Sequence, residues 1–116
     1  MTLKEIAHTL GLAVKTGHHL LDREITGGYA GDMLSDVLAH AGRGNIWVTL
    51  QTHANVVAVA STKELAAIII VEGRTPAEET LRKAEEEGIP IMISDRPTFS
   101  VVCTLGKLGI EGHERV

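Results

Sequence analysis

The sequence predicts an α/β fold: a single domain over residues 1–116, with a mostly parallel β-sheet flanked by helices. Strand-like and helix-like segments alternate along the second half of the chain. Residues 46–50 are rich in β-branched residues and flanked by turn signals, which predicts a strand. Residues 67–71 are apolar without alternation, which is typical of a strand buried on both faces of a parallel sheet. Hydrophobic residues make up 44% of the chain and aromatic residues only 3%, so we expect one aliphatic core.

The first half contains short elements. Residues 2–10 are expected to form a helix, because Thr2 and Glu5 have the spacing of a capping box and Gly11 can end the helix. Residues 12–14 and 24–26 are short extended candidates. A second helix is predicted over residues 32–41, with Asp32 as its N-cap.

Residues 55–60 fit a strand by composition and a helix by position. We favour a helix with Asn55 as its cap, because the connection between two parallel strands is usually helical. The next helix is expected to begin with Thr75 as N-cap and to end at Gly88. A strand over residues 89–93 and a helix over residues 99–108 complete the alternation.

Composition excludes several classes of protein. The net charge of −4 argues against nucleic acid as a partner, because nucleic-acid-binding surfaces are basic. No apolar run approaches the roughly 20 residues that span a bilayer, so we expect no membrane association. The amphipathic first residues do not resemble a signal peptide, and Cys103 is the only cysteine. We therefore expect a cytoplasmic location.

A metal-dependent enzyme is one alternative function. Asp32, Asp36 and His40 recur every four residues, and His53 follows a predicted strand. No paired ligand spacing accompanies them, and a solvated helix face explains the pattern better. Cys103 lies among apolar residues, where a cysteine usually packs as a small hydrophobic side chain. We therefore predict no catalytic residues, no metal and no cofactor.

A helix-turn-helix DNA-binding protein is a less favoured alternative. Residues 4–14 resemble the first helix and turn of that motif. A recognition helix should follow at once, whereas residues 15–19 have the composition of a loop.

The carboxyl ends of parallel strands are where open α/β sheets usually bind ligands. We therefore expect a candidate ligand site where several strand ends meet. Its predicted residues lie around the extended segment 24–26 and after the predicted strand 46–50. They are Asp22, Arg23, Thr26, Gly27, Gly28, Tyr29, Gln51, Thr52, His53 and Asn55.

The two glycines of this set have two interpretations. The loop could cradle an anion, but the sequence T-G-G-Y-A-G matches neither the dinucleotide fingerprint nor the P-loop. We favour a tight turn in which Gly27 and Gly28 adopt positive φ. Arg23 likewise has a structural interpretation, in which it pairs with a carboxylate and fastens a loop to the sheet.

Asp22-Arg23 followed by Thr26-Gly27-Gly28 resembles the signature of the DRTGG domain family. Residues 29–32, 45–61, 66–73 and 85–94 are similar to later blocks of the family, so the resemblance covers nearly the whole chain. It implies a fold like that of the amino-terminal domain of HPr kinase/phosphorylase. Family members also occur within phosphotransacetylases, and between the CBS modules of some pyrophosphatases, where they help dimerisation. The kinase's P-loop is missing here, so kinase activity does not carry over.

The leading functional hypothesis is therefore a non-enzymatic regulatory or adaptor module. We expect it to self-associate, to sense a small metabolite or nucleotide, or to bind a partner protein. A homodimer is predicted through residues 55–60, whose small apolar side chains would let two backbones approach closely.

Overall fold

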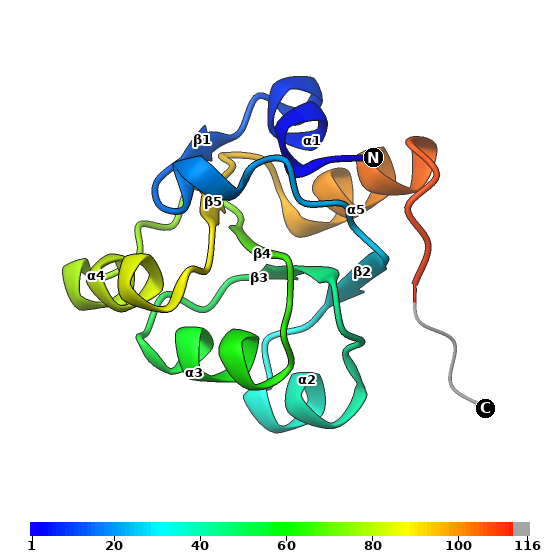
Figure 1. Ribbon diagram of the computed structural model, residues 1–116. Coiled ribbons are helices and arrows are strands. Elements are labelled where there is room, and N and C mark those ends of the chain that lie inside the picture. Colours follow the sequence, from blue (N-terminus) through cyan, green and yellow to red (C-terminus); the bar gives the residue numbers. More distant parts are fainter. Residues whose placement is uncertain (113–116) are drawn as a thin grey trace.

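Within residues 1–112, which the computed structural model describes, a five-stranded β-sheet forms the centre of the molecule (Figure 1). Its strand order is β1-β5-β4-β3-β2. The strands are β1 (Ala13–Val14), β2 (Gly27–Ala30), β3 (Asn45–Thr49), β4 (Ala67–Ile70) and β5 (Ile91–Ile93). Strands β2 to β5 are parallel, and β1 pairs with β5 in the antiparallel direction. The predicted α/β class and mostly parallel sheet are confirmed.

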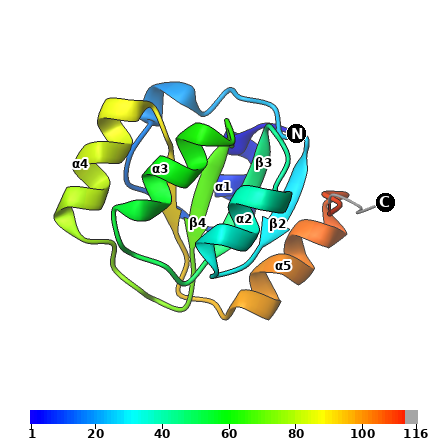
Figure 2. The same ribbon diagram turned by 90° about the horizontal axis from the view of Figure 1, so that it is seen from below.

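Helices cover both faces of the sheet (Figures 1 and 2). One face carries α1 (Leu3–Leu10) and α5 (Thr98–Lys107); the other carries α2 (Leu34–His40), α3 (Asn55–Thr62) and α4 (Glu78–Glu87). A short 3-10 helix, η1 (His18–Leu20), follows β1. No helix within residues 1–112 is long and apolar enough to cross a membrane.

An apolar layer fills the space on each side of the sheet. Aliphatic side chains of α1 and α5 pack on one face and those of α2, α3 and α4 pack on the other. The isoleucines of β4 are fully buried because both faces are covered, which explains why this strand has no polar alternation. Trp47 is also fully buried, and its indole N–H donates to the Gly31 carbonyl oxygen at 2.9 Å.

Several helix boundaries follow the sequence signals. At α1 the Thr2 hydroxyl accepts from the Glu5 N–H, and the Glu5 carboxylate accepts from the Thr2 N–H. The hydrogen bonds that the Thr2 N–H and hydroxyl donate to the Glu5 carboxylate hold the pKa of that carboxyl below its usual range. Gly11 and Gly88 end α1 and α4 in the left-handed conformation, as predicted. Residues 55–62 form a helix, so the favoured interpretation of that segment is correct.

Three predicted N-caps are wrong. Helix α2 begins after Met33, α3 after Ala54 and α4 after Ala77, and none of these starts has a side-chain cap. Asp32 does not cap α2 because its carboxylate is used elsewhere, as described below. Thr75 does not cap α4 because residues 74–77 continue as irregular chain before the helix begins.

Candidate ligand-binding site

The signature residues lie at the beginning of β2. Asp22, Arg23 and Thr26 precede this strand, and Gly27, Gly28 and Tyr29 lie within it. The predicted glycine turn is therefore wrong, since both glycines are paired with β3 in the sheet. Neither glycine is among the residues with positive φ. Tyr29 points toward α2, where its hydroxyl donates to the Asp36 carboxylate at 2.5 Å.

Close approach of another segment explains the glycines instead. The chain after α5 passes beside β2, and the Gly28 N–H donates to the Glu111 carbonyl oxygen at 2.9 Å. A Cβ atom on Gly27 would lie 2.8 Å from that same oxygen. A Cβ on Gly28 would lie 3.4 Å from the Ile110 side chain. Glycine is thus needed for its small size at Gly27, and not for a left-handed backbone.

Thr26 fastens the start of β2 to the turn before β3. Its hydroxyl donates to the Arg43 carbonyl oxygen at 2.7 Å and accepts from the Asn45 side chain at 3.1 Å. Gly44 has φ +79°, and a Cβ there would lie 2.7 Å from the Thr26 methyl group. The threonine of the signature therefore packs against a backbone position that requires glycine.

Arg23 reaches across the ends of the strands. Its Nη1 donates to the Ala66 carbonyl oxygen, just before β4, at 3.3 Å. The sequence-based structural interpretation is therefore correct in placing Arg23 between a loop and the sheet. Its partner, however, is a carbonyl and not a carboxylate. Asp22, the neighbouring signature residue, is exposed.

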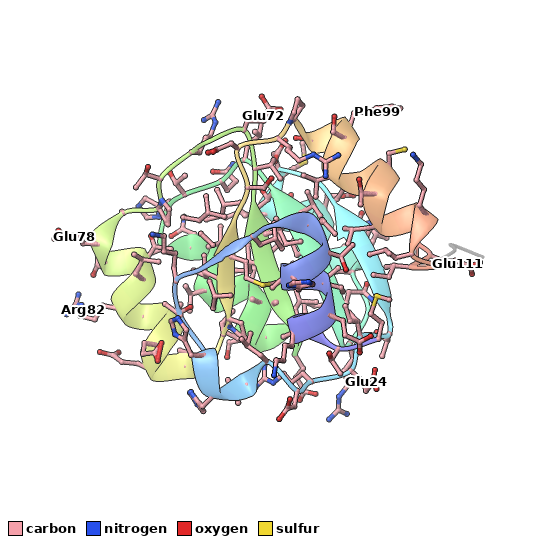
Figure 3. All side chains as sticks on the ribbon, turned by 90° about the horizontal axis from the view of Figure 1, so that it is seen from above. Glu24, Glu72, Glu78, Arg82, Phe99 and Glu111 are labelled. Atoms are coloured by element: carbon pink, nitrogen blue, oxygen red, sulfur yellow. The ribbon has the colours of Figure 1, made fainter. Side chains whose placement is uncertain are left out.

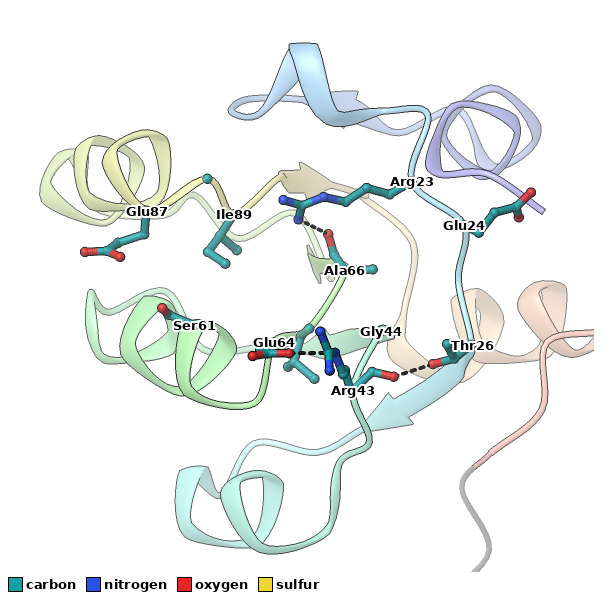
Figure 4. Close-up of a pocket in the computed structure, with 12 residues that line it drawn as sticks. Arg23, Glu24, Thr26, Arg43, Gly44, Ser61, Glu64, Ala66, Glu87 and Ile89 are labelled. Carbon is teal, nitrogen blue, oxygen red and sulfur yellow. Dashed lines mark hydrogen bonds and ion pairs between the residues drawn. The ribbon is translucent and has the colours of Figure 1, made fainter.

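A cavity of about 550 Å³ opens beneath Arg23 (Figure 4). We call it the amino-edge cavity, because Thr26, Gly44, Ala66 and Ile89 of its lining each precede one of the parallel strands. The remaining lining residues come from the loop before β2, the turn after α2, and the ends of α3 and α4; they are Arg23, Glu24, Arg43, Ser61, Glu64, Leu65, Glu87 and Gly88.

Charged groups of the cavity are mostly paired. The Arg43 guanidinium contacts the Glu64 carboxylate at 2.6 Å, and the Glu24 carboxylate contacts the amino group of Met1 at 2.7 Å. An arginine guanidinium has five N–H donors. Within residues 1–112, Arg23 uses one of them in a hydrogen bond and has no carboxylate partner. Arg23 is therefore the cation of this cavity best placed to receive an anionic or carbonyl group.

The second half of the predicted site lies at the opposite edge of the sheet. Gln51, Thr52, His53 and Asn55 follow the carboxyl end of β3, whereas Thr26 lies beside its amino end. Five residues of β3 separate the two edges, a distance of about 16 Å at ~3.3 Å per residue. One small ligand cannot touch both groups, so the predicted convergence is wrong.

Side chains at the carboxyl edge fasten loops to one another. The Asp32 carboxylate accepts from the Thr49 hydroxyl at 2.9 Å and from the Leu50 N–H at 2.7 Å. The Gln51 amide donates to the Asp32 carbonyl oxygen at 2.8 Å. The Thr52 carbonyl oxygen accepts from the Thr80 hydroxyl at 2.7 Å. These hydrogen bonds hold the loops of the carboxyl edge together, while His53 and Asn55 line a separate cavity of about 590 Å³ beside α3 and α4.

The proposed metal ligands are only partly brought together. Asp36 and His40 are 3.1 Å apart, and Asp36 is also bonded to Tyr29. The Nδ1 atom of His53 accepts from the Asn55 N–H at 3.2 Å. In the part of the chain that the structure describes, no group of three or more His, Cys, Asp or Glu side chains is placed to hold a metal ion.

The helix-turn-helix alternative is wrong. Helix α1 is followed by β1 and the 3-10 helix η1, and not by a recognition helix. Lys15 and Thr16 bond to β5: both N–H groups donate to the Ile91 carbonyl oxygen, at 2.8 and 3.4 Å. These residues therefore form part of the sheet edge.

Sequence reasoning missed the residues of the cavity that precede β3 and β4. Arg43 and Glu64 have no motif around them, nor does Glu87 before β5, and ligand sites in parallel sheets are expected at the carboxyl ends of strands. One local signal was available, because Gly42, Arg43 and Gly44 have the composition of a turn directly before a strong strand. The pairing of this turn with the end of α3 depends on tertiary structure.

These features define an α/β domain in which two signature residues, Arg23 and Thr26, line a cavity at the amino edge of the sheet. A family model described as "DRTGG domain" matches residues 5–108, and the chain belongs to this family. It is similar to a crystal structure of the CBS and DRTGG domains of the regulatory region of Clostridium perfringens pyrophosphatase, complexed with the activator diadenosine tetraphosphate.

That likeness has a TM-score of 0.72 with 16% sequence identity. It covers 88% of this chain and 44% of the pyrophosphatase chain, so this chain spans less than half of the length of that structure. At this identity the likeness supports the fold alone. Curated proteins gave no match to the chain.

Proposed function

We propose that this protein is a non-enzymatic regulatory module that senses a nucleotide or small metabolite in the amino-edge cavity and self-associates. Membership of the DRTGG family and the similarity to a regulatory region support the regulatory class. The similar pyrophosphatase region is complexed with a dinucleotide activator, which makes nucleotides the first ligands to test. We further propose that the module acts in the cytoplasm.

The position of Arg23 is the observation that carries the ligand proposal. Its half-buried side chain lines a cavity large enough for a small ligand, and within residues 1–112 its guanidinium uses one of five N–H donors in a hydrogen bond. A phosphate or carboxylate can bind such a guanidinium through two parallel hydrogen bonds. Carbonyl groups and the Ser61 hydroxyl at the same cavity can orient the rest of the ligand.

A thermal-shift screen of nucleotides, acyl phosphates and carboxylate metabolites tests the proposal. A ligand at 100 times its Kd stabilises the folded state by about 2.7 kcal/mol. For a domain of this size that corresponds to a rise in Tm on the order of 10 °C. We expect Arg23→Gln to abolish the shift and Arg82→Gln, on the exposed surface of α4, to retain it.

Two outcomes would contradict the ligand proposal. A complete screen at millimolar concentrations without stabilisation would remove sensing and leave a protein-binding adaptor as the function. Equal shifts in the wild type and in Arg23→Gln would place the ligand elsewhere. The rival metal-dependent enzyme is tested separately by metal analysis of the purified protein. A stoichiometric metal that is lost in Asp36→Asn would support that rival.

A further inference from the structure

Helix α5 exposes an apolar stripe on the side that faces away from the sheet. Phe99, the only phenylalanine of the chain, is 85% exposed, and Val102 is 39% exposed. Cys103 and Gly106 are also exposed, which corrects the expectation that Cys103 is packed. The spacing of these four residues, which we call the α5 seam, places them on one face of the helix.

The opposite face of α5 is already used. Val101 and Leu105 are buried against the sheet, so the helix is apolar on two sides. A helix on the surface of a protein normally presents polar groups on its outer side. An apolar outer side of this kind marks a contact surface.

The seam has a projecting side chain at one end and an open position without a side chain at the other. Phe99 projects from the first turn of α5 (Figure 3). At Gly106, two turns later, a Cβ atom would have no atom within 4 Å. A groove of about 190 Å³ lies beside this end, between α5 and β2. Its lining is mostly apolar and includes Val102, Leu105, Ala30 and Ile110.

Charges at the two ends of α5 are opposite in sign. The Glu72 carboxylate lies at the start of the helix, where it accepts from the Thr98 N–H at 3.4 Å and hydroxyl at 3.1 Å. Figure 3 shows Glu72 and Phe99 at the same end of the helix. Lys107 is exposed at the other end.

We propose that the α5 seam is the interface of a symmetric dimer formed by two copies of this chain. In an antiparallel pair with its two-fold axis near Cys103, Phe99 meets the partner's Gly106 and Lys107 approaches the partner's Glu72. Phe99 and the open position at Gly106 lie on the same surface, as do both charges, so each contact of the symmetric dimer occurs twice. This inference rests on the self-association part of the proposed function and replaces residues 55–60 as the interface.

The valines of residues 55–60 are not available for such an interface. Val56 and Ala60 are completely buried, and Val57 and Val59 are nearly so, within the core beneath α3. The small apolar residues that suggested a dimer surface form the buried face of α3, which connects β3 to β4.

Light scattering at tens of micromolar, together with sedimentation, tests the seam. We expect the wild type to have twice the chain mass of 12.4 kDa. Phe99→Asp and Gly106→Gln should each raise the dimer Kd at least 100-fold while circular dichroism stays unchanged, because both positions are exposed. The control Leu38→Asp, at an exposed apolar position on α2 across the sheet, should remain a dimer.

Cross-linking provides an independent measurement, because Cys103 is the only cysteine. A short bismaleimide should join two wild-type chains through Cys103, and Phe99→Asp should abolish this product. A dimer that persists in Phe99→Asp, or that gives no cross-link, overturns the seam but leaves self-association intact. A wild-type monomer overturns both, whereas ligand sensing at Arg23 is unaffected by either result.

Discussion

Gly27→Ala adds one methyl group at the point where the chain after α5 meets β2. The new Cβ would lie 2.8 Å from the Glu111 carbonyl oxygen, which is closer than van der Waals contact allows. If the new Cβ and the Glu111 carbonyl oxygen stay in contact, overpacking lowers the free energy of unfolding by about 1–3 kcal/mol. If the segment moves away, the hydrogen bond between Gly28 and Glu111 is lost at about 1 kcal/mol.

A smaller effect opposes this cost. Replacing glycine by alanine restricts the unfolded chain and stabilises the folded state by about 0.4–1 kcal/mol. We therefore expect Gly27→Ala to lower the free energy of unfolding by about 1–2 kcal/mol, measured by urea denaturation. Gly112→Ala is the matched control, because a Cβ there meets no atom within 4 Å. Its stability should equal or exceed that of the wild type.

A double-mutant cycle tests the cause. In a chain that stops at Ile110, the Glu111 carbonyl oxygen is absent and Gly27→Ala should no longer destabilise. The coupling energy between the truncation and the substitution should therefore be about 1–2 kcal/mol. An equal loss of stability in both backgrounds would refute the reasoning, and the cost of alanine would then have to arise within β2 itself.

Three further substitutions follow from the contacts described above. Val56→Asp should prevent folding, because it buries an unpaired charge. For Ala58→Asp, exposed on the same helix, the free energy of unfolding in urea should lie within about 0.5 kcal/mol of the wild-type value. A folded Val56→Asp monomer would contradict the burial of Val56. Asp32→Ala should cost about 1–3 kcal/mol because it removes two hydrogen bonds to a carboxylate, with the exposed Asp22→Ala near zero by the same assay. Gly44→Ala should lower Tm by several degrees because its φ is +79°, and an unchanged Tm would argue against strain there.

Much of the fold is readable from the sequence because local signals and burial agree. The capping box at Thr2 and the glycines at residues 11 and 88 act within one helical turn, so their outcome does not depend on distant residues. Strand β4 is apolar throughout, and β3 is apolar over residues 46–48, because both faces of the sheet are covered. Capping failed at Asp32 because a distant partner, the end of β3, binds its carboxylate.

The role of the signature glycines could not be read in the same way. A sequence shows that Gly27 and Gly28 lack side chains, but not whether the reason is a left-handed backbone or a crowded neighbour. The neighbour here is Glu111, more than 80 residues away along the chain. The sequence-based prediction placed the glycines in a turn after the extended segment 24–26, whereas they lie within β2. The signature was therefore assigned to the carboxyl edge of the sheet instead of the amino edge.

Strand order is consistent with the proposal of a ligand site at the amino edge. Ligand crevices at carboxyl edges arise where successive crossovers go to opposite faces and the strand order reverses. From β2 to β5 each strand lies beside the one that follows it in the chain, and the connecting helices α2, α3 and α4 all cover one face. No reversal occurs within these strands, so their carboxyl ends gain no crevice from topology. The amino ends, in contrast, meet where Arg23 crosses toward Ala66, over the cavity that the ligand screen addresses.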